Sequence, residues 1–366
     1  MQYEFVTFES NEPYSAIITN LWTYANHGHS RSELLQIREL LNDLGISVEI
    51  VTLVDDYGIS PRFSLGKATH RLRLDHSRYF KNWVDKRLIR DLGKILKRVV
   101  EISSATETQV ALTSAKISHA REISRSWKLR EKKVSIRFLD TPQSNEDWLA
   151  LSKDLNESLS VQNIAFELKS SVKEAECYFS NVIHVPAAQS LHVESKEVNE
   201  RRFRVGAFWP VGRSFNLDKI KILLEAIEDF KPIVKLPATL NTREFHAKYP
   251  QISFIKQGTP DEEFRKILST IKVAVLGHEN YVNQSSAYAS YFVSNDVPVL
   301  TSKENAFFID LEIDPTNSLE YEPRTIKKKI ETSLKRDLRP GVSVFAEYSR
   351  SQWLKFLNYD DLKNKK

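Results

Sequence analysis

The chain has 366 residues, of which 41% are hydrophobic, 28% charged and 10% aromatic, the composition of a folded globular protein and neither a disordered chain nor a fibre. This length exceeds one ordinary hydrophobic core and predicts two domains. The single cysteine, Cys177, excludes an internal disulfide framework and a cysteine-rich metal site. The apolar runs fall far short of the roughly 20 residues that span a bilayer, and the N-terminus lacks a signal-peptide pattern, so we expect a cytoplasmic protein.

The net charge of +5 is unevenly distributed along the chain. Between residues 71 and 98, ten lysines and arginines stand against three aspartates. A local excess of this kind marks a surface that faces anions, such as lipid head groups, phosphates or nucleic acid. The alternative is an ordinary solvated helix face.

A strand, a loop, a helix and a second strand are predicted between residues 15 and 53. The helix shows one apolar face at helical spacing, formed by Leu34, Ile37, Leu41 and Leu44. Ser30 and Glu33 occupy capping-box positions at its start, and Gly45 occupies the position after its last turn. Such a βαβ unit implies a parallel sheet with a right-handed crossover.

The rest of the first half continues the alternation of helices and strands. A long helix is predicted over residues 79–101 and another over 145–159, and strands are predicted within 109–116, 134–142 and 181–187. The polar stretch 187–202 lacks apolar periodicity and is interpreted as a linker, which makes residues 1–186 the first domain.

A second α/β series begins after this stretch and forms the predicted domain 203–340. Strands are expected at 203–209, 233–237, 252–258, 272–277 and 297–302, with helices at 217–230, 261–271, 286–293 and 324–335. The last helix, within 341–366, is expected to pack back toward the first domain. The predicted fold is therefore α/β, with two Rossmann-like parallel-sheet domains facing each other across a cleft.

Ligands of open α/β sheets bind beyond the carboxyl ends of the strands, where helix N-termini favour phosphate. In the second domain, Gly212 and Arg213 precede the predicted N-cap Asn216, so backbone and guanidinium could hold a phosphate; a turn glycine followed by a surface arginine is the alternative. Lys235, at the end of a strand, could neutralise phosphate or could be a solvated lysine. Glu279 could accept hydrogen bonds from ribose or sugar hydroxyls.

A polar cluster lies at the start of the helix predicted over 286–293. It consists of Asn283, Gln284, Ser285 and Ser286. These side chains could bind a pyrophosphate or sugar hydroxyls beside the positive end of the helix. Ordinary capping by one of the two serines is the competing explanation.

The first domain offers candidates for proton transfer. His27 and His29 lie ahead of the first helix, and Asp140 ends a strand, so each could act as a general base or bind substrate. A solvated loop histidine and a turn-capping aspartate are the alternatives. No third ligand lies at a diagnostic spacing from the two histidines, so no metal site is predicted. His184 is interpreted as structural or interdomain.

The organisation of the second half resembles that of GT-B glycosyltransferases, in particular glycosyltransferase group 1 or family 4. The resemblance is carried by residues 204–227, 255–277 and 290–302, the last ending in Asn295-Asp296-Val297-Pro298-Val299, where the family has a short G-x-P-V turn. Many members carry two glutamates eight positions apart in the donor loop and following helix. Here the second position falls near Tyr291, and no glutamate lies between Glu279 and Pro298. The pattern leaves open a divergent donor site, an inverting enzyme or a scaffold without activity.

The resemblance implies sugar transfer from a nucleotide-diphosphate donor, held by the second domain, to a glycan, lipid-linked or other acceptor hydroxyl held by the first. It implies a role in cell-surface polysaccharide or glycoconjugate synthesis and requires no cofactor. The basic segment 71–98 could contact an anionic membrane, which would place the protein at the inner face of the membrane. A nucleic-acid-modifying glycosyltransferase, a non-catalytic GT-B-like partner subunit, and an epimerase or pyruvyl transferase on a similar frame are the alternatives. A redox enzyme is disfavoured because neither half has a G-x-G-x-x-G pattern after its first strand.

Overall fold

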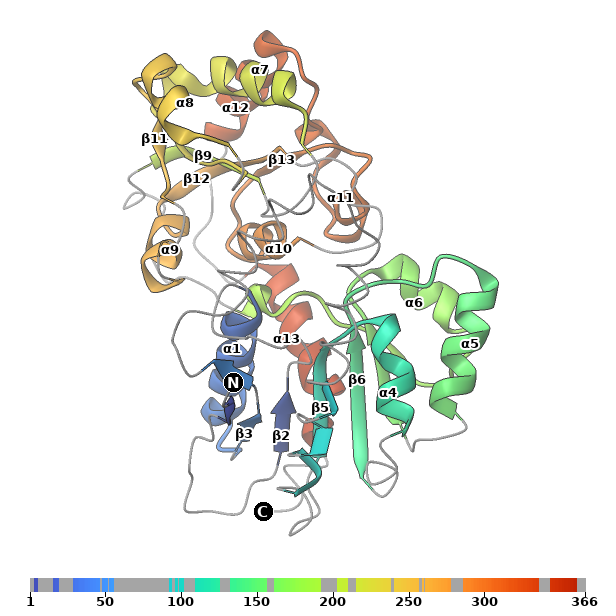
Figure 1. Ribbon diagram of the computed structural model, residues 1–366. Helices are drawn as coiled ribbons and strands as arrows, with labels where there is room; N and C mark the ends of the chain where they lie inside the picture. Colours follow the sequence, from blue (N-terminus) through green and yellow to red (C-terminus); the bar gives the residue numbers. More distant parts are fainter. Residues whose placement is uncertain are drawn as a thin grey trace, which may run out of the picture. The chain divides into compact units, whose positions relative to one another are not determined.

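The computed structural model describes eighteen stretches of the chain, to which all structural statements below apply. They are residues 3–5, 16–19, 29–46, 48–51, 53–55, 92–93, 96–97, 99–101, 109–125, 132–156, 161–191, 203–209, 215–237, 240–256, 259, 261–277, 286–335 and 343–360. The chain forms two compact units, coloured by sequence in Figure 1. Unit 1 comprises Met1–Pro186 and Ser351–Lys366, and unit 2 comprises Ala187–Arg350.

Unit 1 is built on a parallel sheet of six strands in the order β3-β2-β5-β6-β7-β8. The strands are β2 (Ala16–Thr19), β3 (Val48–Val51), β5 (Gln109–Ala115), β6 (Lys133–Phe138), β7 (Val161–Phe166) and β8 (Val182–His184). The helices are α1 (His29–Asp43), η1 (Ile117–His119), α4 (Ala120–Arg125), α5 (Asn145–Asn156) and α6 (Lys169–Ala175). A separate antiparallel pair joins β1 (Tyr3–Phe5) to β4 (Leu53–Asp55).

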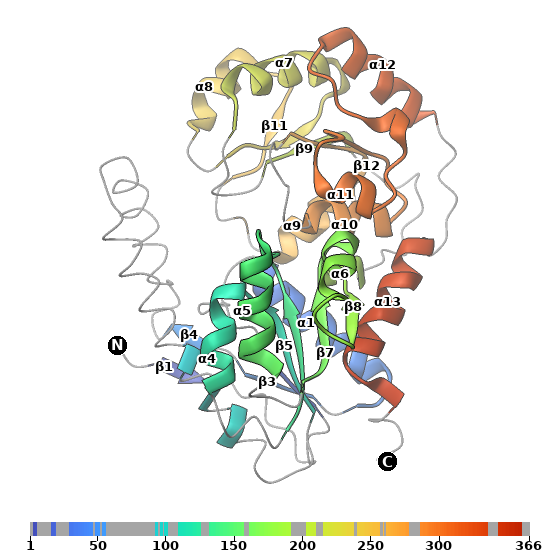
Figure 2. The same ribbon diagram turned by 90° about the vertical axis from the view of Figure 1, so that its right-hand side faces the viewer.

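Alternation along the strands gives this sheet two different faces. On β6, Val134, Ile136 and Phe138 join the main core with Trp148 and Leu151 of α5, and Figure 2 shows α4 and α5 together on that side. The intervening residues Ser135 and Arg137 are buried on the opposite face. One face of the sheet is therefore apolar, and the other carries a buried polar cluster.

The predicted first helix and its C-terminal end are confirmed in α1, but its predicted start is not. Leu34, Ile37 and Leu41 are buried. Gly45 has a φ of 71°, and the amide of Ile46 donates to the Leu41 carbonyl (2.9 Å), the pattern of a Schellman C-cap. The helix begins at His29, so Ser30 lies inside it, and the predicted capping box is wrong.

Several elements of unit 1 were not expected, among them the antiparallel pair of β1 and β4. Strand β7 was not expected because its first three residues are only half-buried and only Ile164, Ala165 and Phe166 form an apolar run. Helix α6, with seven residues, was not expected either. Helix α5 is described as far as Asn156, and the last three residues of the predicted helix 145–159 lie outside the described residues. Of the long helix predicted over 79–101, the described part is helical and buries Leu92, Leu96 and Val99.

Unit 2 contains a parallel sheet of five strands in the order β11-β10-β9-β12-β13. The strands are β9 (Phe203–Phe208), β10 (Ile233–Lys235), β11 (Ser253–Phe254), β12 (Ile271–Leu276) and β13 (Val299–Thr301). The helices are η3 (Ala188–Leu191), α7 (Leu217–Ile227), η5 (Glu228–Phe230), α8 (Thr242–Lys248), α9 (Asp261–Leu268), α10 (Ala287–Ser294), α11 (Ala306–Asp310), η6 (Pro315–Asn317) and α12 (Pro323–Leu334). Helix α13 (Val344–Phe356) begins in unit 2 and ends in unit 1.

The five strands expected in the second half are all present, and α7 follows the sequence closely. Asn216 caps it by accepting hydrogen bonds from the amides of Asp218 (2.9 Å) and Lys219 (3.1 Å), and its predicted inward residues are buried. Helix α9 ends at Leu268, so the end of the predicted helix 261–271 belongs to a turn and to β12. Helices α8 and α11 were not predicted.

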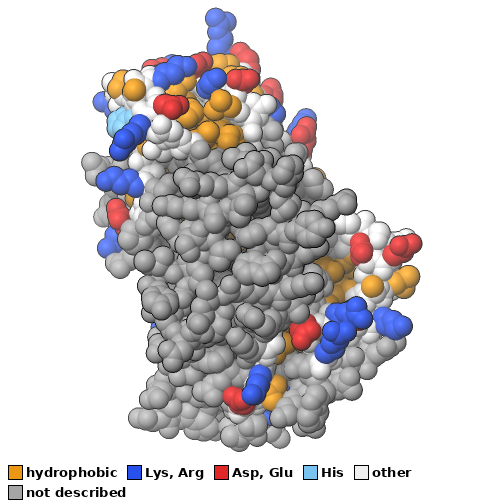
Figure 3. Space-filling view, viewed as in Figure 1, with side chains coloured by type: hydrophobic (Ala, Val, Ile, Leu, Met, Phe, Trp, Pro, Cys, Tyr) orange, Lys and Arg blue, Asp and Glu red, His pale blue; other side chains and the backbone are white. Residues whose placement is uncertain are grey.

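The surface of unit 2 near α7, α8 and α12 carries charges of both signs. Figure 3 shows basic and acidic side chains interspersed there. Lys327 pairs with Asp229 (2.6 Å) and Lys248 with Glu225 (3.6 Å), and all four side chains are largely exposed. Among the described helices, none is long and apolar enough to cross a membrane.

Candidate active site

Each sheet has one point where its strand order reverses direction, and a ligand is expected beyond the carboxyl ends of the strands at such a point. In unit 1 this point lies between β2 and β5, and in unit 2 it lies between β9 and β12. The side chains at these two edges, taken unit by unit, define the candidate site.

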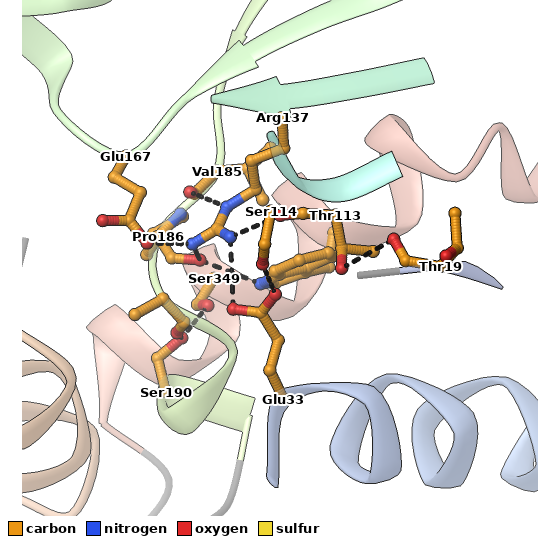
Figure 4. Close-up of polar contacts among 12 residues, drawn as sticks. Thr19, Glu33, Thr113, Ser114, Arg137, Glu167, Val185, Pro186, Ser190 and Ser349 are labelled. Carbon is orange, nitrogen blue, oxygen red and sulfur yellow. Dashed lines mark hydrogen bonds and ion pairs between the residues drawn. The ribbon is translucent and has the colours of Figure 1, made fainter. Parts of the chain in front are cut away.

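The edge of unit 1 is organised around Arg137, at the end of β6 (Figure 4). Its guanidinium is fully buried and forms ion pairs with the carboxylates of Glu33 (3.2 Å) and Glu167. Glu33 comes from α1, and Glu167 follows directly after β7. Two carboxylates therefore share one guanidinium at the carboxyl edge of the sheet.

A β-bulge brings β5 into the same cluster. The register between β5 and β6 shifts between Leu112 and Ala115, so β5 carries one extra residue there. Within this stretch the Ser114 hydroxyl donates to Glu33, and the Thr113 hydroxyl donates to the Thr19 carbonyl at the end of β2 (3.4 Å). The bulge thus directs two consecutive hydroxyl side chains toward buried polar partners at the strand reversal.

These contacts replace the capping box predicted at the start of α1. A capping-box glutamate would reach back to the backbone of its own helix. Glu33 instead accepts hydrogen bonds from Ser114 and Arg137, which are 81 and 104 residues away in the sequence. The arginine inside the apolar segment VSIRFLD was the available sequence signal for this cluster, because a charge buried within a strand must have a partner.

Asp140 lies two residues beyond β6, where the sequence places it, and it is half-buried. Its carboxylate accepts a hydrogen bond from the Ile117 amide at the start of η1 (2.8 Å). Burial raises the pKa of Asp140, although the bond from Ile117 and the charge of Lys116 act in the opposite direction. A carboxylate with a raised pKa is a stronger base once ionised.

His119, which was not predicted as a site residue, lies in η1 on the same side of the sheet. Its Nδ1 accepts a hydrogen bond from the Lys116 amide (3.3 Å), which leaves the proton of the neutral ring on Nε2. Burial, assisted by the positive charge of Lys116, lowers the pKa of His119 to about 4. Helix η1 therefore carries a neutral imidazole at its end and binds a carboxylate with a raised pKa at its start.

The two predicted histidines are only partly described. His29 is the first residue of α1, and His27 lies outside the described residues. His184, interpreted from the sequence as structural, ends β8 with its Nε2 bonded to the Glu167 carbonyl (2.9 Å). Burial is the main cause that lowers the pKa of His184 to about 4.

In unit 2, Lys235 lies at the carboxyl end of β10, as predicted, but it is not a solvated lysine. Its ammonium donates to the Tyr288 hydroxyl (3.0 Å) and lies 4.1 Å from the centre of the Phe264 ring. Tyr288 in turn stacks on Phe208, the last residue of β9. Aromatic rings thus hold a positive charge at the carboxyl edge of the sheet.

Ser286 is the N-cap of α10. Its hydroxyl accepts a hydrogen bond from the Ala289 amide (3.3 Å), and the residue is only 3% exposed. The capping explanation therefore describes Ser286. The other predicted donor-site residues lie outside the described residues: Gly212, Arg213, Glu279, Asn283, Gln284 and Ser285.

The strand reversal in unit 2 is closely packed. Gly277 follows β12, and its amide donates to the Phe208 carbonyl (3.2 Å). A Cβ on Gly277 would lie 2.4 Å from the indole of Trp209, the residue after β9, so only glycine fits there. The Tyr321 hydroxyl donates to the Gly277 carbonyl (3.3 Å).

No cluster of three or more metal-ligating side chains occurs in the described parts of the chain.

No family model matches the sequence, and no curated protein matches it. Solved structures match over nearly the whole chain. The UDP-GlcNAc 2-epimerase of Methanocaldococcus jannaschii is 11% identical, with a TM-score of 0.54 and coverage of 94% of this chain and 99% of that chain. MnaA of S. aureus, in a co-structure with UDP, is 9% identical, with a TM-score of 0.54 and coverage of 94% and 97%.

A trehalose-6-phosphate structure from E. coli, bound with UDP-2-fluoro glucose, is 8% identical, with a TM-score of 0.51 and coverage of 96% of this chain and 97% of that chain. At these identities the likeness concerns the fold. The two parallel-sheet units expected from the sequence are confirmed. The chain has the GT-B fold, which nucleotide-sugar glycosyltransferases and UDP-GlcNAc 2-epimerases share.

Proposed function

We propose that the chain is a glycosyltransferase that moves a sugar from a nucleotide-diphosphate donor to an acceptor hydroxyl. The observation that carries this proposal is the GT-B fold over at least 94% of the chain, shared with structures bound to UDP and to UDP-2-fluoro glucose. This is an argument from the fold, and the described edge residues support it chemically. The acceptor class, a glycan, lipid-linked or other acceptor hydroxyl, is proposed from the sequence resemblance alone.

In the proposed reaction the bond between the anomeric carbon and an oxygen of the donor diphosphate breaks, and a bond from that carbon to the acceptor oxygen forms. The acceptor hydroxyl loses its proton to a base, and the nucleoside diphosphate leaves. Asp140 is our candidate base, because it is a half-buried carboxylate at the edge of unit 1 with a raised pKa. His27 and His29 remain predicted alternatives.

Negative charge develops on the departing diphosphate, so fixed positive charge at the donor edge would stabilise it. Lys235 is our candidate for this role, since its ammonium is held in place by Tyr288 and Phe264. Arg213 remains a predicted phosphate ligand. No metal or cofactor is required by this scheme.

The donor assignment is tested by thermal stabilisation with UDP and other nucleoside diphosphates. We expect one nucleotide to raise the melting temperature of the wild type, and Lys235→Met and Arg213→Ala to reduce that rise. Lys256→Met, which removes an exposed lysine that follows β11, is the matched control and should behave as the wild type does. No stabilisation by any nucleotide at millimolar concentration would overturn the donor site and favour a non-catalytic role.

An epimerase acting on the same donors is the second candidate, because the M. jannaschii structure of this fold is a UDP-GlcNAc 2-epimerase. Incubation of the protein with nucleotide sugars and acceptors, analysed by chromatography and NMR, separates the two. A transferase releases nucleoside diphosphate only when an acceptor is present. An epimerase leaves the nucleotide sugar intact and inverts one of its ring carbons.

The basic segment 71–98 remains a prediction for contact with an anionic membrane from the cytoplasmic side, or, alternatively, with nucleic acid. Vesicle flotation with phosphatidylglycerol, against phosphatidylcholine as control, tests the membrane contact. A salt-dependent association with duplex DNA, and none with anionic vesicles, would favour the nucleic-acid alternative.

A further inference from the structure

All three guanidinium nitrogens of Arg137 donate hydrogen bonds within unit 1. Its hydrogen-bond acceptors are the Val185 carbonyl (3.0 Å), the Thr113 carbonyl (2.8 Å), the Glu33 carboxylate (3.2 Å), the Pro186 carbonyl (3.3 Å) and the Glu167 carboxylate. Trp353 covers the guanidinium at 5.0 Å and donates from its indole nitrogen to the Pro186 carbonyl (3.1 Å). One side chain therefore joins α1, the bulge of β5, the turn after β7, the last residues before the chain leaves unit 1, and α13.

Stability is a poor explanation for such an arrangement. Burying three charged groups costs several kcal/mol of desolvation per ion, and apolar side chains of the same volume often stabilise a core equally well or better. Glu33 and Glu167 are 5% and 9% exposed, and Arg137 is completely buried. What the charged cluster provides, and an apolar core would not, is a fixed geometry, because the planar guanidinium directs its hydrogen bonds along set directions.

The element fixed most directly is the N-terminal part of α1, which Arg137 contacts at Glu33. The first four amides of a helix have no acceptor within it, so the first turn depends on contacts outside the helix. Glu33 is the fifth residue of the helix, directly after its first turn, and it is held by Arg137 and Ser114. His29 is the first residue of α1, about one turn before Glu33.

We propose that Arg137 is a positioning residue, which orients the N-terminal part of α1 through Glu33 and thereby places the start of this helix, at His29, at the edge of unit 1. Its effect on turnover rests on the proposed function. Its effect on the start of α1 does not rest on the proposed function. The two proposals can therefore fail independently, one in the turnover assay and the other in a measurement of the helix itself.

The structural test is hydrogen exchange measured by mass spectrometry on the full chain, with Glu33→Gln and Arg137→Lys. Glu33→Gln removes the negative charge at constant size. Arg137→Lys keeps the positive charge but offers three donors, where the arginine serves five acceptors. We expect the amides of residues 33–37 to exchange at least tenfold faster in both variants, while α7 in unit 2 exchanges as in the wild type.

Arg125→Lys is the matched control, because Arg125 makes an exposed ion pair with Glu122 (3.8 Å) in the same unit. It should leave exchange in α1 unchanged. Unaltered exchange at 33–37 in Glu33→Gln would overturn the proposal, and so would a uniform acceleration across unit 1, which indicates general destabilisation. If Arg137→Lys does not fold, Glu33→Gln decides the question.

The catalytic test follows once turnover has been demonstrated. We expect Glu33→Gln to lower kcat at least tenfold with little change in the donor KM, because the donor is assigned to unit 2. A rise in KM at unchanged kcat would overturn the positioning role in catalysis. If the wild type shows no turnover, the proposed function fails, and the exchange result still decides whether Arg137 fixes the start of α1.

Discussion

Replacing Gly277 by alanine should force an overpacked contact at the strand reversal of unit 2. The added Cβ would lie 2.4 Å from both Cε2 and Cζ2 of Trp209 and 2.6 Å from its Nε1. Contacts this short essentially never occur in folded proteins, and Trp209 is 2% exposed, so its ring can move only by displacing the neighbours that pack against it. Overpacking costs about 1–3 kcal/mol, and we expect Gly277→Ala to lie near the upper end, about 2–3 kcal/mol.

Differential scanning calorimetry measures this cost, because it can resolve the unfolding of the two units. For a unit of this size, a loss of about 2–3 kcal/mol corresponds to a melting temperature lower by roughly 4–12 °C. The double-mutant cycle with Trp209→Leu isolates the contact. Removing the indole should make the added cost of Gly277→Ala small.

Gly93→Ala is the matched control. Among the described atoms its added Cβ would meet only the Glu122 carboxylate, at 3.9 Å, and it lies in a helical segment, where alanine is preferred by up to about 1 kcal/mol. It should therefore be neutral or stabilising. A cost of Gly277→Ala below about 0.5 kcal/mol, or an equal cost with and without the indole, would refute the packing argument.

Three further outcomes are expected. Asn216→Ala should cost about 1 kcal/mol of unfolding free energy in urea titrations, because it removes the side-chain cap of α7. The folded protein holds the pKa of His119 at about 4, below the unfolded value near 6.5, so its contribution to stability is present above pH 6.5 and is lost as the pH falls toward 4. His119→Gln should make the decline of the urea midpoint over this window shallower. Asn163→Ala should speed proteolysis near the C-terminus, because the Asn163 amide donates to Asn358 (2.8 Å) and to the Phe356 carbonyl (3.2 Å) at the end of α13.

Each of these has a control. Asn216→Asp keeps an oxygen acceptor and should therefore retain most of the stability that Asn216→Ala loses. His246→Gln, at an exposed position, should leave the pH dependence unchanged, and a shallower slope there would contradict the assignment to His119. Asn156→Ala removes an exposed amide that bonds only to Ser152 among the described contacts, and equal proteolysis of this variant would show that Asn163 does not hold the C-terminus.

The sequence predicted most elements because the forces that define them act over short distances. Helix α7 shows the Asn216 cap and a stripe of apolar residues, and both can be seen within twelve residues. Gly45 marked the end of α1 because an L side chain is strained at a φ of 71°. The strands of unit 2 are bounded apolar runs. Strand β7 was not predicted because Gln162 and Asn163 interrupt its apolar pattern and its first three residues are only half-buried.

The candidate site was less accessible because its contacts join residues far apart in the sequence. Asp140 and Lys235 could be placed at strand ends from the sequence, but the rings around Lys235 come from α9 and α10. Glu33 was expected to cap its own helix, and no local signal showed that it would pair with Arg137, 104 residues away in the sequence.

The sequence by itself therefore determined the α/β class, most of the elements and the strand ends, because helical period, apolar runs and caps are local. Only the tertiary structure decided the strand order, the bulge that directs Ser114 to Glu33, and the partners of Arg137. The physical reason is that a buried charge is satisfied by whichever groups the strand crossovers bring within hydrogen-bond distance, and this depends on the packing of the whole unit.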